Sequence, residues 1–266
     1  MSKNYDTENI IARYQEMPVS INQIAEEFNL CSVTISKILR NSNIKLWTRQ
    51  DLNVGNLKVD FFKQIDTEAK AYLLGLFAAD GCIYTANSGK LFSIQLQTED
   101  AYMIEYVKAK LNAPRNIVVD KRDGSYSISV VNDGFVDNLA KYGVVTGKAN
   151  RFLPDIADHL MHHYIRGLFD GDGSIIIRKS HSYGQAMRYC VVLLAHSKLI
   201  VQLQNYLERR LDLSHLSLNN DGSTAHSIRY SRQKDIIAII NYMYSNAHLY
   251  LLRKFQKCKQ AISYLS

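Results

Sequence analysis

The sequence predicts an α+β protein built from two tandem αββαββα repeats, preceded by a small all-α domain. The stretch LLGLFAADG at residues 73–81 returns as IRGLFDGDG at residues 165–173, at a constant offset of 172 − 80 = 92 residues. After each copy, two pairs of strand-like segments with turn signals are separated by a helical pattern. Each half therefore predicts helix, two strands, helix, two strands and helix, with pseudo-twofold symmetry between the halves.

The composition favours a soluble globular protein. The chain has 266 residues, 47% of them hydrophobic, and no apolar run approaches the roughly 18 residues of a membrane span. Its start, MSKNYDTENIIARY, resembles neither a signal peptide nor a transit peptide. We therefore expect no membrane partner and a cytoplasmic location in a bacterium or a phage-infected host, with an organelle as the alternative.

The cysteines and the charge limit the chemistry further. The four cysteines are scattered without CxxC spacing, which argues against a zinc cage and a disulfide framework. Lys and Arg exceed Asp and Glu by 32 − 25 = 7, and the sequence pI is about 9.1. Such an excess suits a polyanionic partner such as nucleic acid.

The first repeat, residues 61–160, begins with the first motif. The strand-like CIYTA, a turn at residues 87–89 and the alternating LFSIQLQ follow it. A helix is expected from about residue 99 to 111, and then a hairpin that turns at Asp123-Gly124.

The second repeat, residues 161–266, has the same order. SIIIRKS, a polar loop around Tyr183-Gly184 and MRYCVVLLA follow the second motif. A helix is expected from about residue 198 to 211, and then a hairpin that turns at Asp221-Gly222.

The alternation in these strands predicts one covered and one open face for each sheet. Phe92, Ile94 and Leu96 would face covering helices, while the opposite side carries amides, hydroxyls and arginines. Such groups read base edges and phosphates, although a sheet with one solvated face needs no ligand. The candidate contacts to double-stranded DNA in the repeats are Tyr84, Ser93, Gln95, Gln97, Arg122, Ser125, Ser127, Arg178, Arg188 and Arg229.

The motif itself predicts close helix packing and a metal site. Gly75 and Ala79 lie four residues apart, as do Gly167 and Gly171, so each helix presents small residues along one side; a glycine near a helix end can also be a C-cap. The same packing would bring Asp80 and Asp172 together at equivalent helix ends. Two neighbouring carboxylates repel each other unless a cation lies between them, and Mg²⁺ suits a site with few carboxylates.

LLGLFAADG and IRGLFDGDG resemble the two copies of the LAGLIDADG motif in monomeric homing endonucleases, and the resemblance extends over roughly residues 61–266. It implies a saddle of two antiparallel sheets in the DNA major groove, with the motif helices between them. The implied activity is that of intron homing enzymes: metal-dependent, site-specific cleavage of both strands of a long asymmetric DNA target, leaving short 3′ overhangs.

The resemblance also implies roles for individual residues. Asp80 and Asp172 would bind Mg²⁺ over the scissile phosphates, with Mn²⁺ or Ca²⁺ able to substitute in binding; whether the backbone at position 79 adds a ligand stays open. Lys148 and Lys254 resemble the basic residues near each catalytic centre, where a solvated surface lysine is the alternative.

Two further positions differ between the repeats. Gln97 resembles a residue that orients water, and the second half has Leu194 or Ala195 near that place. Asp170, whose counterpart is Ala78, is expected to form hydrogen bonds, either at the helix end or between the domains, rather than to bind metal.

Residues 1–44 predict a helix-turn-helix domain. ENIIARYQEM, SINQIAEEFNL and CSVTISKILRNSNI are helical patterns, with Ser20 and Ser32 as caps of the second and third helices. The expected core comprises Ile21, Ile24, Ala25, Phe28, Val33, Ile35, Ile38 and Leu39. The third helix would enter the major groove. The DNA contacts expected here are Ser32, Thr34, Ser36, Lys37 and Arg40, followed by Lys45 and Arg49 in a linker over residues 45–60, where Trp47 is a further candidate.

Other functions stay open at this point. A three-helix bundle can serve protein contacts instead of DNA. The whole scaffold could be a DNA-binding transcriptional regulator without cleavage activity, or an RNA maturase. The presence of both Asp80 and Asp172 favours the endonuclease.

Overall fold

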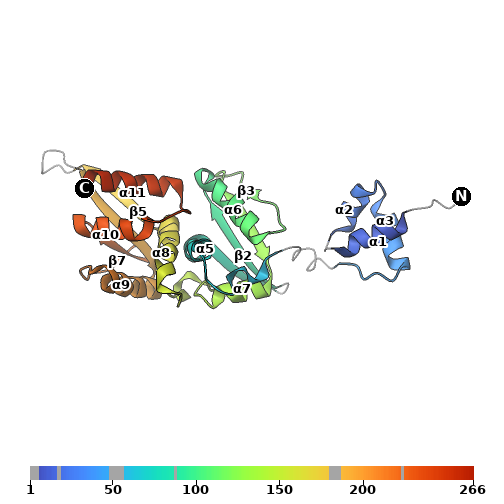
Figure 1. Cartoon of the computed structure of the whole chain (residues 1–266), viewed down its shortest axis with the longest axis horizontal. Helices are drawn as coiled ribbons and strands as arrows, with labels where there is room; N and C mark the ends of the chain where they lie inside the picture. The colour runs from blue at the N-terminus through green and yellow to red at the C-terminus, as the bar shows by residue number, and fades with distance from the viewer. Residues whose placement is uncertain (1–5, 17–18, 48–56, 87–88, 180–186, 223–224) are drawn as a thin grey trace.

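The computed structural model describes residues 6–16, 19–47, 57–86, 89–179, 187–222 and 225–266 (Figure 1). Its order of elements is that of an α+β protein with two four-stranded antiparallel sheets preceded by N-terminal helices. Across these residues, no helix is long and apolar enough to cross a membrane.

The N-terminal helices are α1 (Thr7–Glu16), α2 (Ile21–Glu27) and α3 (Ser32–Asn41), and they pack around a small core of their own. Ser20 caps α2 as expected, because its Oγ accepts from Gln23 N at 3.2 Å and its N–H donates to the Gln23 side chain. The cap predicted at Ser32 is wrong. Cys31 is the N-cap of α3 and Ser32 is its first residue.

The expected core of this unit also needs a correction at Val33, which is 62% exposed on α3. Ile35 and Leu39 fill the core from the opposite side of the helix, so Val33 points outward instead. Trp47, expected in the linker, lies against the same unit. Its Nε1 donates to the carbonyl oxygen of Tyr14 at 2.9 Å, and its backbone N donates to the Tyr14 hydroxyl at 2.8 Å.

The first repeat begins with the 3-10 helix η1 (Val59–Phe62) and the motif helix α5 (Glu68–Asp80). It continues through β1 (Gly81–Ala86), β2 (Gly89–Leu96), η2 (Thr98–Asp100), α6 (Ala101–Leu111), β3 (Val118–Val119), β4 (Tyr126–Val131), α7 (Asp133–Ala140) and η3 (Lys148–Asn150). The strand order of its sheet is β1-β2-β4-β3.

The second repeat contains α8 (Asp158–Asp172), β5 (Ser174–Lys179), β6 (Met187–His196), α9 (Ser197–Leu211), β7 (Asn219–Asn220), β8 (Ala225–Tyr230), α10 (Gln233–Tyr244) and α11 (Leu252–Leu265). Its sheet has the equivalent order β5-β6-β8-β7. The predicted αββαββα order is confirmed in both halves, and α11 is an addition to it. The loop around Tyr183-Gly184 lies outside the described residues.

The motif helices α5 and α8 lie side by side at the centre, between the two sheets (Figure 1). A Cβ on Gly75 would collide with the carbonyl oxygen of Tyr164 and lie 2.9 Å from Leu168 N. A Cβ on Gly167 would meet Tyr72 and lie 2.8 Å from Leu76 N. The prediction that small residues let the helix backbones approach closely is therefore confirmed.

The predicted covered faces are also confirmed. Phe92, Ile94 and Leu96 are buried, while Gln95 between them is exposed. The opposite face is not uniformly open. Ser125 is 5% exposed and Ser227 has no exposed surface, because neighbouring side chains bind both hydroxyls.

Candidate active site

The two motif acids end their helices side by side. Asp80 is the last residue of α5 and Asp172 the last of α8, and Gly81 and Gly173 then carry the chain into the strands. A Cβ on Gly171, the neighbour of Asp172, would lie 2.8 Å from Asp80 Oδ2. Because Gly171 has no side chain, the carboxyl of Asp80 can lie against the end of α8.

The electrostatics of this place favour a cation. Burial, followed by the negative charge of Asp172, raises the pKa of Asp80 to about 6, although Lys148, Lys254 and Arg253 act in the opposite direction. The protein's own basic groups therefore do not fully compensate the two acids. A divalent cation bound by carboxylate oxygens would do so, and the donor set fits Mg²⁺.

Of the two predicted lysines, Lys148 is the one that forms an ion pair with a motif acid. It begins η3, and its Nζ lies 3.9 Å from Asp172 Oδ2. Lys254 is buried, and its ammonium donates to the carbonyl oxygen of Gly173. Burial lowers the pKa of Lys254. Lys254 is thus bound to the residue that joins α8 to β5, and its charge acts on Asp80 from there.

Arg151 is a residue that the sequence did not reveal. It is 3% exposed, and its Nη2 donates to the carbonyl oxygen of Gly81 at 2.6 Å, while Nη1 binds those of Ala78 and Ala79. Because Gly81 and Gly173 are equivalent in the repeats, Arg151 is the counterpart of Lys254. Each repeat places one buried cation against the carbonyl end of its motif helix, where the helix dipole favours positive charge.

A cavity of about 430 Å³ opens beside Asp80. Gln97, predicted to orient water, lines it together with Gln95 and Ser125, which were predicted as DNA contacts. Gln95 Nε2 donates to Ser125 Oγ, and that hydroxyl donates to Asp123 Oδ1 at 2.6 Å. The other lining residues are Leu96, Asp123, Gly171 and Arg253. The structure therefore places Gln97 in the cavity beside Asp80, and it brings the predicted DNA contacts Gln95 and Ser125 to the same cavity.

The strand register corrects the expected counterpart of Gln97. Gly81 pairs with Ile94, three residues before Gln97. In the second repeat Ser174 pairs with Val192, so the same register places Leu193 opposite Gly173, the equivalent of Gly81. Three residues after Leu193 is His196, which therefore corresponds to Gln97. The expectation of Leu194 or Ala195 at this place is wrong, and Leu194 instead corresponds to Gln95.

The open face of the second sheet carries three arginines. Arg178 lies opposite Arg188 across β5 and β6, and Arg229 lies opposite Val192 on the same face. Arg178, Arg188 and Arg229 line one cavity of about 270 Å³. Asp221 accepts from Arg229 Nη2 at 2.9 Å. Like charges directly opposite each other destabilise a sheet, so this face suits an anionic partner.

The predicted contacts on the first sheet are mainly uncharged. Tyr84 is 57% exposed on β1. Ser93 on β2 and Ser127 on the neighbouring β4 share a face with Gln95. Arg122 lies at the hairpin turn, where its Nη2 binds Asp120 Oδ2 at 2.6 Å. The two sheets therefore present different chemistry on equivalent faces.

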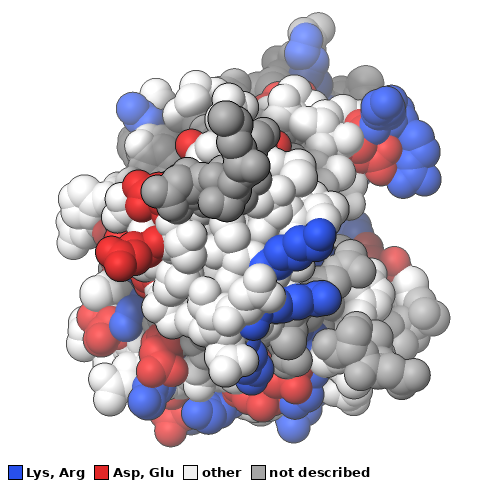
Figure 2. All heavy atoms as spheres, turned by 90° about the vertical axis from the view of Figure 1, so that its right-hand side faces the viewer, with Lys and Arg blue, Asp and Glu red and all other residues white. Residues whose placement is uncertain are grey.

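On α3, Lys37 and Arg40 are exposed, while the predicted contacts Ser32, Thr34 and Ser36 are half-buried. Lys45 is exposed, and Arg49 lies outside the described residues. Figure 2 faces the side on which Figure 1 draws these helices, and shows basic side chains projecting from a largely uncharged surface with acidic groups nearer its margins.

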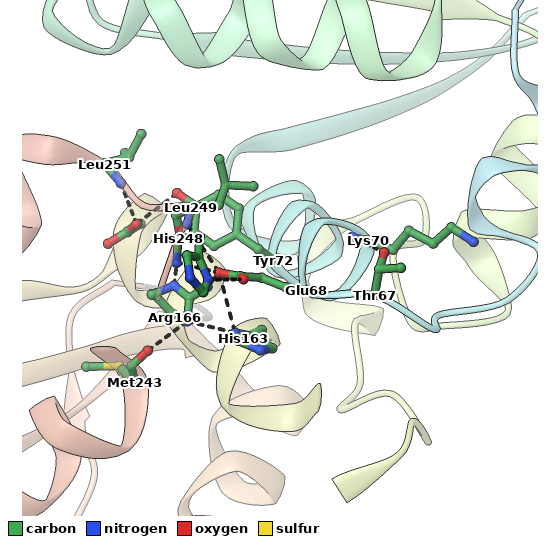
Figure 3. A network of polar contacts seen from close by, with 11 residues as sticks. Thr67, Glu68, Lys70, Tyr72, His163, Arg166, Met243, His248, Leu249 and Leu251 are labelled. Atoms are coloured by element: carbon green, nitrogen blue, oxygen red, sulfur yellow. Dashed lines mark hydrogen bonds and ion pairs between the residues drawn. The ribbon is translucent and has the colours of Figure 1, made fainter. Parts of the chain in front are cut away.

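A buried polar network fixes the two motif helices to each other (Figure 3). Arg166 of α8 has no exposed surface, and its Nη2 donates to Glu68 Oε1 of α5 at 2.7 Å. The same guanidinium donates to the carbonyl oxygens of Met243 and Leu249. His248 N also donates to Glu68 Oε1, at 2.8 Å. The start of α5 is thus tied to the segment between α10 and α11.

Asp170 belongs to a second set of hydrogen bonds across this interface. It is fully buried and accepts from Tyr72 Oη of α5 at 2.8 Å, from Tyr244 Oη and from Leu251 N at 2.7 Å. The prediction that Asp170 forms interdomain hydrogen bonds is confirmed.

Comparisons with known proteins support the fold. No protein-family model matches the chain. An uncharacterised protein of Methanocaldococcus jannaschii is 26% identical over an alignment 191 positions long, which covers 66% of this chain and 66% of that protein. The match thus spans just under two thirds of that relative.

Several solved structures are similar over most of their length. A lysine-to-alanine double variant of I-SmaMI matches with a TM-score of 0.55 at 14% identity, covering 72% of this chain and 90% of that chain. The LAGLIDADG meganuclease I-AabMI, bound to uncleaved DNA, gives 0.54 at 15% identity, covering 72% and 88%. The LAGLIDADG homing endonuclease I-LtrWI, bound to target DNA, gives 0.53 at 12% identity, covering 78% and 90%.

I-SmaMI bound to an uncleaved DNA target in the presence of calcium ions also matches, with a TM-score of 0.52 at 12% identity, covering 76% of this chain and 94% of that chain. These identities are low, and what the structures have in common with this chain is its architecture of paired sheets around two central helices. The chain shares the fold of the LAGLIDADG homing endonucleases.

Proposed function

We propose that this protein is a site-specific, metal-dependent DNA endonuclease of the homing type. The observation that carries the proposal is the convergence of Asp80 and Asp172 at the ends of two helices packed through glycines. Neighbouring carboxylates cost stability in a partly buried place unless a ligand compensates them. Their retention in both repeats therefore points to a bound cation and to catalysis.

Asp80 and Asp172 would hold Mg²⁺, and Mn²⁺ or Ca²⁺ could substitute in binding. When bound, the cation supplies Lewis-acid stabilisation to phosphodiester hydrolysis. Lys148, beside Asp172, would stabilise negative charge on a phosphate. Gln97, beside Asp80, would orient a water molecule through its amide. Lys254 would fix the start of β5 and add positive charge to the site.

Double-stranded DNA is the proposed partner. The arginines of the second sheet and the amides and hydroxyls of the first suit phosphates and base edges. Residues 1–44 would form a helix-turn-helix domain with α3 in the major groove, followed by a linker over 45–60 and the repeats at 61–160 and 161–266. Both motifs lie in one chain, so a monomer would carry a complete site and cut a long asymmetric target with short 3′ overhangs.

The test begins with selection of a binding site from randomised duplex DNA in Ca²⁺, followed by incubation of the selected duplex in Mg²⁺ or Mn²⁺. Parent protein, Asp80→Asn and Asp172→Asn are compared, with Asp212→Asn, an exposed acid at the end of α9, as the matched control. The parent and control should cut, while the two motif variants should bind without cutting.

A parent protein that binds a long duplex but never cuts it in any divalent cation would overturn the nuclease and support a DNA-binding regulator. Preferential binding of structured RNA over the selected duplex would support a maturase instead.

A further inference from the structure

Arg253 reaches the Asp80 half of the site although it belongs to the second repeat. It lies in the first turn of α11, and its Nε donates to Asp100 Oδ2 at 2.7 Å. Asp100 ends η2 in the first repeat. Arg253 lines the same cavity as Asp80 and Gln97.

The buried position of Asp100 is unusual for an acidic residue. It is 1% exposed, and its Oδ1 has no hydrogen-bond partner in the described part of the chain. The equivalent turn of the second repeat, at the start of α9, buries Leu199 and Ile200 instead. A buried carboxylate without full compensation is costly, so its presence needs a reason beyond packing. Its one side-chain partner here is the guanidinium of Arg253.

The first repeat also holds the backbone that carries Arg253. Tyr102 Oη of α6 donates to the carbonyl oxygen of Tyr250 at 3.1 Å and accepts from Leu252 N at 2.8 Å. Upstream, His248 N donates to Glu68 of α5. The approach to α11 is therefore fixed relative to the first repeat, and with it the position of Arg253.

One edge of the guanidinium stays available. Within the described residues, the hydrogen bond to Asp100 uses Nε, and Nη1 and Nη2 donate to no protein atom. The side chain is 40% exposed. A planar guanidinium held by one carboxylate and open on its other edge is suited to a phosphate, which accepts two parallel hydrogen bonds.

The Asp172 half of the site has a different arrangement. The cation beside Asp172 is the ammonium of Lys148, whose Nζ lies 3.9 Å from Asp172 Oδ2. Leu199 takes the place of Asp100 in the second repeat, so among the described residues the pairing of an arginine with a buried acid at this turn is found on the Asp80 side.

We propose that Arg253 binds the scissile phosphate on the Asp80 side, and that Asp100 is the positioning residue that aims it. The assignment rests on the proposed endonuclease function. It makes the two strand cleavages chemically unequal, because one phosphate would be bound by a fixed guanidinium and the other would not.

The test uses a selected target duplex with a different fluorophore on each strand, and measures single-turnover cleavage of both strands. Arg253→Ala should slow one strand by about 100-fold relative to the other, the usual scale for loss of a charge-stabilising donor. Arg253→Lys should recover part of that loss, and Asp100→Asn should slow the same strand by a smaller factor. Arg209→Ala, an exposed arginine of α9, is the matched control and should leave both rates unchanged.

Equal slowing of both strands in Arg253→Ala would assign the side chain a structural role and overturn the proposal, as would parent-like rates on both strands. Thermal unfolding of each variant identifies loss of fold, and Arg253→Lys keeps the test valid if the alanine variant unfolds. A parent protein that cuts neither strand overturns the endonuclease function itself, and the assignment of Arg253 falls with it.

Discussion

Arg166 of α8 and Glu68 of α5 form an ion pair of 2.7 Å across the interface of the two repeats, with the guanidinium fully buried. The equivalent residue of the first motif is Leu74, so the pair has no symmetric copy. Arg166 also binds His163 and two backbone carbonyl oxygens. The relation between the repeats is therefore fixed by specific polar contacts as well as by the glycine stripe.

Replacing Arg166 by methionine should destabilise the protein by about 3 kcal/mol or more, because it leaves buried acceptors without a donor. Denaturant unfolding measures the loss. In the double variant with Glu68→Gln, the loss should be smaller than the sum of the two single losses. Strictly additive losses would show that the ion pair does not couple the helices.

A methyl group at the centre of the interface should be poorly tolerated. Gly75→Ala would drive a Cβ into the backbone of Tyr164 and Leu168, at a cost of about 3 kcal/mol or more. Gly134→Ala on α7, whose nearest neighbours are side-chain atoms at 3.2 Å and beyond, is the control. We expect a large fall in melting temperature for the first variant and a small change for the second. Similar melting temperatures would argue against close packing of α5 on α8.

The buried histidine of the network predicts a pH dependence of stability. Burial, followed by the positive charge of Arg166, lowers the pKa of His163 to about 4. The unfolded chain protonates this histidine near pH 6.5, so its contribution is complete above that pH and is lost as the pH falls towards 4. Relative to His163→Gln, the parent should lose about 2 kcal/mol of unfolding free energy between pH 7 and pH 4.5. Parallel pH profiles for the two proteins would contradict this.

A divalent cation should stabilise the folded parent. Since the folded site gathers Asp80 and Asp172 and the unfolded chain does not, a saturating cation at about 100 times its Kd would add roughly 3 kcal/mol. Thermal unfolding with Mg²⁺ and with a chelator measures this shift. Asp172→Asn should lose most of it, and the exposed-acid control Asp212→Asn should retain it. An equal shift in all three proteins would place cation binding elsewhere.

The N-terminal helices should extend the DNA contact without affecting the chemistry. Because Trp47 packs on Tyr14, the deletion that removes the whole unit covers residues 1–47. We expect this deletion to shorten the protected footprint on one flank and to leave the cleavage rate at saturating protein unchanged. Lys37→Ala combined with Arg40→Ala should weaken protection of the same flank. An unchanged footprint would remove the DNA-binding assignment of this unit.

The repeat was predictable because the residues needed for helix packing and for the proposed chemistry occur in both motifs. Gly75, Gly167 and the two terminal aspartates recur at one offset, and that offset identified both motif helices and the place where they meet. The contrast between Ala78 and Asp170 also carried information, because it indicated a role for Asp170 in hydrogen bonds between the repeats, which the structure confirms.

Other parts of the site depend on tertiary placement that no local pattern records. Arg151 and Arg253 lie near helix and turn boundaries whose sequences do not match between the repeats. Asp100 looks like an ordinary acid at a helix start until its burial is known. Val33 fits an apolar pattern and still points outward, because the N-terminal core is filled by Ile35 and Leu39.

The most direct measurement is cleavage of a supercoiled plasmid that carries the selected site, followed in Mg²⁺ as conversion to nicked and linear forms. The parent should linearise the plasmid, while Asp80→Asn and Asp172→Asn should bind the site with parent affinity and yield no linear product. Linearisation by either variant at the parent rate, or a parent that leaves the plasmid supercoiled while bound to it, would contradict the assignment of Asp80 and Asp172 as the catalytic pair.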